Sequence, residues 1–127
     1  MQTLLLIGAG GALGAISRHL VGQLALRLVG PGLPWGTLAV NLVGSLAMGV
    51  LIGALAAWGK TDTHWLRHAA GIGFLGGFTT FSAFSLELVV MLERKAWGMA
   101  LAYMSVSVVL SAGAVMAGLM IMRKVTG

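Results

Sequence analysis

The chain has no cysteine and very little charge. Its 127 residues include three Asp or Glu and eight Lys or Arg, so 9% are charged, whereas 58% are hydrophobic. The lack of Cys excludes disulfides and thiolate metal sites. A chain this short with a mean hydropathy of +0.98 cannot bury its apolar surface in a soluble core, so it belongs in a bilayer. The positive charges are scattered singly or in pairs, which argues against nucleic acid as a partner.

Four segments are long and apolar enough to cross a membrane as helices. A hydrocarbon core of about 30 Å needs about 20 apolar residues, and the sequence supplies them at about 3–28, 35–58, 65–92 and 97–122. The connections PGLPWG, GKTDTH and ERKAWG are short and carry Gly, Pro or charge. Every Trp falls at a span end, where the indole ring favours the headgroup region: Trp35, Trp58, Trp65 and Trp97. The sequence therefore predicts an all-α integral membrane protein with a single membrane domain, 1–127.

Positive charges near the span ends give almost no preference for one orientation in the membrane. One side carries Lys60, Arg67, Arg123 and Lys124, and the other carries Arg27, Arg94 and Lys95. Cytoplasmic loops normally have an excess of Lys and Arg. Two interpretations stay open: both orientations insert and pair as an antiparallel dimer, or Asp62, Glu93 or helix hydrophobicity selects a single topology. Four helices are few to enclose a pathway, which favours an oligomer in either case.

Small and polar residues recur every four positions in three of the spans. These faces are Thr37, Asn41, Ser45, Gly49 and Gly53 in the second span, Tyr103, Ser107 and Ser111 in the fourth, and Gly10, Gly14, Arg18 and Gly22 in the first. Such stripes commonly let membrane helices pack closely. Asn41 is harder to explain by packing, because its own helix cannot easily satisfy its amide in hydrocarbon.

The third span contains the stretch GGFTTFSAFS, residues 76–85. Gly76 and Gly77 followed by Thr79 and Thr80 are poor helix formers about a dozen residues from each span end, so we predict a break near the bilayer midplane. Unwound carbonyls at that depth are tolerated when they are buried in protein or face a cavity, and they commonly coordinate a hard cation. The alternative is a mild kink in which the Thr hydroxyls satisfy the freed backbone groups.

Two phenylalanines and an acid follow the break at a spacing of three. They are Phe81, Phe84 and Glu87, with the hydroxyls of Thr80, Ser82 and Ser85 close by. Phenylalanines at such positions often fill a core. An aromatic ring also has a positive edge, so this pair beside hydroxyls and the Asn41 amide could present several weak positive contacts to an anion.

Three motifs resemble the Fluc fluoride channels, also called CrcB proteins. They are GFLGGFTTFSAFSLE in the third span, WGTLAVNLVGS in the second and GALGAISR in the first, and the resemblance covers essentially the whole chain. It implies an antiparallel, dual-topology homodimer with two fluoride pores and a structural sodium ion on the dimer axis. It also implies roles for individual residues: backbone carbonyls of Gly76 and Thr79 for sodium, Asn41 in the pore vestibule, Phe81 and Phe84 as paired rings, and Tyr103, Ser107 and Ser111 as a hydroxyl track with Ser82 or Ser85 nearby.

The residue types suit that assignment. Fluoride is small and strongly hydrated, so a pore must replace its water with donors that carry no fixed charge, and amides, hydroxyls and ring edges meet that need. A full positive charge would trap the ion. Arg18 is therefore better interpreted as an attractor toward the vestibule, with snorkelling to the headgroups as an equal alternative. Glu87 must be protonated, hydrogen-bonded or turned aside.

Two other functions remain open from the residues. A small proton-coupled multidrug exporter would also be a four-span antiparallel dimer, but its carboxylate is expected in the first span, so Glu87 would have to serve. A structural membrane subunit would explain the small-residue stripes and leave the break unexplained. An enzyme is not expected, because no usable Ser-His-acid set, Cys nucleophile or His cluster occurs. His64 and His68 are four residues apart and fit an interfacial position better than a metal site.

Overall fold

The computed structural model describes residues 1–59 and 62–127, and within these ranges the regular structure is helical. The helices are α1 (Gln2–Val29), α2 (Trp35–Trp58), α3 (His64–Leu66), η1 (Arg67–Leu75), α4 (Gly76–Phe78), α5 (Phe81–Glu93) and α6 (Trp97–Thr126). Among the described residues, four helical spans are long and apolar enough to cross a membrane, and α3, η1, α4 and α5 together form the third of them. This confirms the predicted four-span, all-α fold. Lys60, which entered the charge count, lies outside the described residues.

The helix ends differ little from the predicted spans. The second span has the predicted bounds, and the largest difference is in the fourth, where α6 continues to Thr126. The extra turn of α6 contains Arg123 and Lys124, which an apolar-window argument excludes from a span. Cations in the last turn of a helix stabilise it by interacting with the partial negative charge at its C-terminus. The helix therefore continues past the apolar stretch.

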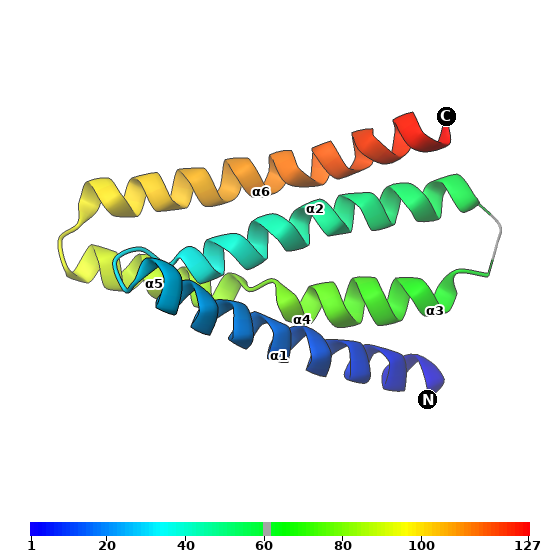
Figure 1. The fold of residues 1–127 in the computed structure, drawn as a ribbon, viewed down its shortest axis with the longest axis horizontal. Helices are drawn as coiled ribbons and strands as arrows, with labels where there is room; N and C mark the ends of the chain where they lie inside the picture. The colour runs from blue at the N-terminus through cyan, green and yellow to red at the C-terminus, as the bar shows by residue number, and fades with distance from the viewer. Residues whose placement is uncertain (60–61) are drawn as a thin grey trace.

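The four spans lie roughly along the long axis of the molecule, and both termini are at the same end (Figure 1). The helix α2 runs beside α6, whereas α1 packs against η1 and α4 in the first half of the third span. The second half, α5, packs against α6. A buried cluster forms there from Phe84, Met91, Ala100 and Tyr103. The two halves of the third span therefore have different neighbours.

The third span changes its backbone conformation twice. From Arg67 to Leu75 it is a π-helix, which no feature of the sequence predicted, and Gly76–Phe78 is α-helical. Thr79 and Thr80 are extended, with ψ angles of 155° and 121°. A break in this span is therefore confirmed, near the middle of His64–Glu93. It lies after the two glycines, which stay helical.

The glycines that precede the break are used for close helix packing. A side chain on Gly77 would collide with the carbonyl oxygen of Gly11, and one on Gly14 would collide with that of Phe74. The backbone of α1 therefore lies directly against the backbone of the third span. This explains why Gly77 remains helical despite its low helix propensity, because tertiary packing outweighs a cost of about 1 kcal/mol.

A second close contact joins α2 to α6. A side chain on Gly49 would overlap the carbonyl oxygen of Val115, and one on Gly118 would meet the Leu46 carbonyl and the Val50 amide. The predicted stripe on α2 thus has two functions along its length. Its glycine end packs against α6, and its polar end, with Asn41, faces the break in the third span.

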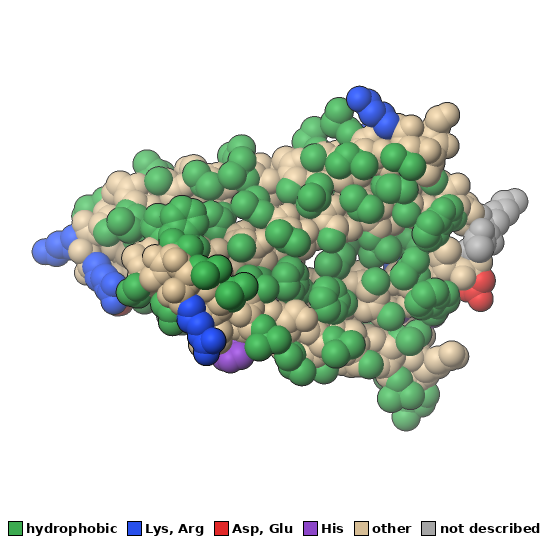
Figure 2. Space-filling model, viewed as in Figure 1, with side chains coloured by type: hydrophobic (Ala, Val, Ile, Leu, Met, Phe, Trp, Pro, Cys, Tyr) green, Lys and Arg blue, Asp and Glu red, His purple; other side chains and the backbone are tan. Residues whose placement is uncertain are grey.

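Apolar side chains cover much of the surface between the two ends of the molecule, while most Lys and Arg lie toward those ends (Figure 2). Large exposed apolar residues occur on every span, among them Leu13, Val43, Phe81 and Val109. The four Trp residues are also exposed. This distribution is the one expected of a protein whose solvent is lipid.

Candidate functional site

The break between α4 and α5 is stabilised by its own two threonines. The Thr79 hydroxyl donates to the Leu75 carbonyl at 2.9 Å, as does the Thr79 amide at 3.0 Å. The Thr80 hydroxyl accepts a bond from the Ala83 amide at 3.1 Å and so caps the N-terminus of α5. The chain can leave the helix at this depth because the hydroxyls replace part of the lost backbone bonding.

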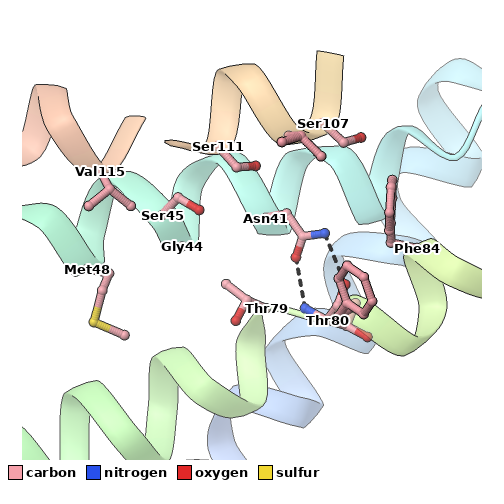
Figure 3. Close-up of a pocket in the computed structure, with 12 residues that line it drawn as sticks. Asn41, Gly44, Ser45, Met48, Thr79, Thr80, Phe84, Ser107, Ser111 and Val115 are labelled. Atoms are coloured by element: carbon pink, nitrogen blue, oxygen red, sulfur yellow. Dashed lines mark hydrogen bonds between the residues drawn. The ribbon is translucent and has the colours of Figure 1, made fainter. Parts of the chain in front are cut away.

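Asn41 of α2 bonds to both backbone groups of Thr80. Its Nδ2 donates to the Thr80 carbonyl oxygen at 3.1 Å, and its Oδ1 accepts from the Thr80 amide at 2.8 Å. Figure 3 shows the two bonds side by side. The Thr80 amide would, in a continuous α-helix, have bonded to the Gly76 carbonyl. That carbonyl therefore loses its helical donor.

A cavity of about 380 Å³ lies beside the break, between α2, α5 and α6 (Figure 3). Six of the residues predicted to form a fluoride pathway line it: Asn41, Thr80, Phe81, Phe84, Ser107 and Ser111. The Ser107 hydroxyl is buried and forms no hydrogen bond with the described residues. A buried hydroxyl without a protein partner at a cavity wall is available to a ligand or a water molecule. The cavity thus combines an amide, hydroxyls and ring edges without a charged side chain.

The two phenylalanines after the break differ in their surroundings. Phe84 is 6% exposed and packs against Tyr103, with ring centroids 5.2 Å apart. Phe81 is 77% exposed in the single chain, and its ring centroid is 5.5 Å from that of Phe84. Both rings line the cavity. Phe84 therefore belongs to the core of the chain as well as to the cavity wall, whereas Phe81 projects from it.

Glu87 is held by hydroxyls from two other helices. Thr37 of α2 donates to its Oε1 at 2.6 Å, and the Tyr103 hydroxyl of α6 donates to its Oε2 at 2.7 Å. This resolves the question that the sequence raised about the acid, because the carboxyl group is hydrogen-bonded. Thr37 was visible in the sequence as the first member of the polar stripe on α2, but its partner is fifty positions away, and helix periodicity does not relate such distant residues.

Four predicted site residues lie away from the cavity, and one of them is Tyr103, whose hydroxyl donates to Glu87. The Ser85 hydroxyl donates to the Phe81 carbonyl in its own helix at 2.9 Å, and the Ser82 hydroxyl is 3.3 Å from that of Thr80. Arg18 lines a separate cavity of about 310 Å³ with Thr37, Thr80 and Ala83 among its neighbours. Thr80 lines both cavities, so Arg18 is close to the break without lying on the cavity that holds Asn41 and Phe84.

The carbonyls of Gly76 and Thr79 fit a hard cation in their chemistry. Gly76 is exposed on the single chain, Thr79 is partly exposed, and the Gly76 carbonyl has lost its helical donor to Asn41. Carbonyl oxygens are the ligands that such cations use in discontinuous membrane helices. His64 and His68 form no comparable site: His68 Nδ1 donates to the His64 carbonyl at 2.7 Å, and the described residues hold no group of three or more His, Cys, Asp or Glu that could bind a metal.

These features define a four-span helical membrane protein with a broken third span and a cavity of uncharged donors. A family model described as "CrcB-like protein, Camphor Resistance (CrcB)" matches residues 5–119. A relative from Phenylobacterium zucineum (strain HLK1) is 53% identical over 125 residues, which cover 98% of each chain. Others come from Caulobacter sp. (strain K31), 51% identical with 98% of each chain covered, and Beijerinckia indica subsp. indica, 44% identical with 99% of this chain and 100% of the relative covered. Each of the three is named "Fluoride-specific ion channel FluC". The chain belongs to the CrcB family.

Proposed function

We propose that this chain is the protomer of a passive, fluoride-selective channel that exports fluoride and lowers its concentration in the cytoplasm. The observation that carries the proposal is the cavity beside the break, which offers the Asn41 amide, the free Ser107 hydroxyl and the edges of two phenylalanine rings. The names of its full-length relatives support the same ion and an ion-channel function in place of an enzymatic one. The family suggests a bacterial inner membrane as the location.

The chemistry of the cavity explains the preference for fluoride. This anion holds its water tightly, so several donors must replace the lost hydration at once, while a fixed positive charge would bind the ion too strongly to release it. The Ser107 and Ser111 hydroxyls line the cavity along α6, one turn apart, and Tyr103 lies one turn beyond them. The two serines supply neutral donors along the direction of the span, whereas the single hydroxyl proton of Tyr103 is donated to Glu87.

We propose that two chains of opposite orientation form the channel. The single chain leaves Phe81 77% exposed although it lines the cavity, and one side of the cavity is open to the surroundings. A second chain would cover Phe81 and close the pathway. The near balance of positive charge between the two sides supports insertion in both orientations.

A sodium ion on the dimer axis would be held by the backbone carbonyls of Gly76 and Thr79 from each chain. Gly76 is the first residue of the three-residue helix α4 and Thr79 is its C-cap, so both lie in the last helical turn before the break, where the helix dipole leaves partial negative charge on the carbonyls. The ion would neutralise this charge where the two broken spans meet. The role of this site in the proposal is structural, and fluoride does not bind to it.

The experiment that tests the function is flux from proteoliposomes loaded with fluoride, chloride or an organic cation. We expect rapid fluoride efflux that requires no proton gradient, with chloride retained. Efflux of the organic cation driven by a proton gradient would instead support the exporter alternative based on Glu87, whose carboxyl group is bonded by Thr37 and Tyr103. A Glu87→Gln variant separates the two, because it abolishes proton coupling but preserves a hydrogen-bonding group. Absence of fluoride flux in folded protein would refute the channel.

A further inference from the structure

The side chain of Asn41 is bonded at both ends to a single residue of another span. Its amide nitrogen and oxygen contact the carbonyl and the amide of Thr80 at 3.1 and 2.8 Å. A side chain that merely faced an open vestibule would not need this pairing. Asn41 is only partly buried and lines the cavity, so solvent there can satisfy its amide. The need for hydrogen-bond partners alone therefore does not explain why both polar atoms bond to protein.

The pairing is possible because Thr80 is extended. In a strand, the N–H and C=O groups of one residue point to the same side of the backbone, so one neighbouring amide can bond to both. In an α-helix the two groups of a residue point in opposite directions along the axis, and a single carboxamide cannot reach them together. The bonds of Asn41 therefore exist in the broken form of the span and not in a continuous helix.

We propose that Asn41 is the positioning residue that selects the broken form of the third span. Because its two bonds favour the extended conformation of Thr80 over the helical one, they shift the equilibrium between these forms toward the break. The selection acts on the backbone and is the same whichever ion the protein conducts.

The position of Asn41 is itself fixed by α2. The glycine end of that helix packs on α6 through Gly49 and Gly118 with no room for side chains. Asn41 therefore fixes Thr80 relative to the pair α2 and α6, and Thr80, as the cap of α5, determines where that helix starts. Phe81 and Phe84 lie in the first turn of α5, so the residue at which the helix starts determines where their rings lie.

Fixing the amide has a second consequence for the cavity. The nitrogen of Asn41 carries two hydrogens in one plane, and the bond to Thr80 uses one of them. The direction of the other is then determined, in a side chain that lines the cavity. Positioning the break and presenting a donor are compatible tasks for this one side chain.

Amide hydrogen exchange at Thr80 tests the proposal in the full-length protein in lipid nanodiscs. In the unmodified protein we expect the Thr80 amide to be protected although it belongs to neither helix. Asn41→Leu keeps a similar volume but removes both bonds, so the exchange at Thr80 should become about 10- to 100-fold faster. Exchange at Val115, in α6, should stay unchanged, which a general loss of stability would not allow.

Two further variants keep the test decisive. Ser45→Ala alters the next polar residue along the same helix face and the same cavity, and it should leave exchange at Thr80 unchanged. Asn41→Ser provides a smaller replacement, in case leucine prevents folding, and its Oγ, one bond nearer the backbone than the amide atoms of Asn41, falls short of the two groups of Thr80. An unprotected Thr80 amide in the unmodified protein, or equal protection in a folded Asn41 variant, would overturn the proposal. Flux does not decide it, because loss of a donor and loss of the break both reduce fluoride efflux.

Discussion

Replacement of Phe84 and Phe81 by isoleucine, one at a time, tests whether their rings act on the anion or only fill space. Isoleucine retains much of the apolar volume but lacks the positive ring edge. Both rings line the cavity, yet Phe84 is 6% exposed and Phe81 is 77% exposed in the single chain. The two substitutions should therefore have similar effects on flux and different effects on the stability of the protomer.

The expected cost in stability follows from these surroundings. Phe84→Ile changes the shape of a buried side chain, at about 1–2 kcal/mol, and removes the ring contact with Tyr103, at about 0.5–1.5 kcal/mol. Phe81→Ile should change protomer stability by about 0.5 kcal/mol or less, as for other exposed positions. A larger loss for Phe81→Ile that appears only in the assembled protein would indicate that a second chain covers this ring.

Flux should fall at least about tenfold in each variant, which corresponds to a loss of about 1.4 kcal/mol of stabilisation of the permeating ion. The assay is initial fluoride efflux from proteoliposomes, measured with a fluoride electrode and normalised to folded protein. Phe78→Ile is the matched control, because Phe78 is 8% exposed and stacks on Phe74 with centroids 5.7 Å apart, but it does not line the cavity. It should lose stability and keep flux. Near-normal flux in both cavity variants would refute the role of the rings and leave permeation to the hydroxyls of α6.

Three other predictions test the assembly and the packing. A reporter cysteine at Thr126 should be labelled from both sides of the membrane if the chain inserts in both orientations, and labelling from one side would contradict this. Thr79→Ala should leave a bound sodium ion in place, apart from local packing losses, because the proposed ligand is the main-chain oxygen; ion-replacement diffraction that finds no cation at the break would exclude the site. Gly118→Leu should destabilise the protein by about 3 kcal/mol or more in thermal unfolding, since the new side chain meets the backbone of α2, whereas Gly113→Leu points into open space and should be tolerated. Equal stability of these two glycine variants would show that the close contact is not required.

The spans and most of the cavity were predictable because they follow from local patterns. Apolar length located four helices, the period of four placed Asn41 and Ser107 on polar faces, and the GGFTT sequence indicated a break. The π-helix was not predictable, because a bonding pattern of five differs too little from a pattern of four over nine residues to leave a signal in side-chain spacing.

Contacts between residues distant in the sequence were also not predictable. The bonds of Glu87 to Thr37 and Tyr103 require knowledge of how α2, α5 and α6 are arranged. The pairing of Asn41 with Thr80 further requires that Thr80 be extended, which the sequence indicated only as a region of low helix propensity. The sequence identified Asn41 as unusual because an amide in an apolar span needs hydrogen-bond partners, and geometry was needed to find them.

Because of the break, the two halves of the third span can move independently of each other. The half before Thr79 is seated backbone to backbone on α1, while the half after Thr80 rests on α6 and is tied to it through Glu87 and Tyr103. A continuous helix would transmit a twist or a push from one half to the other, but two extended residues transmit little. Rotation of α1 in the bilayer, as when lipid thickness changes, should therefore be absorbed at Thr79 and leave Thr80, which Asn41 holds, and α5 in place.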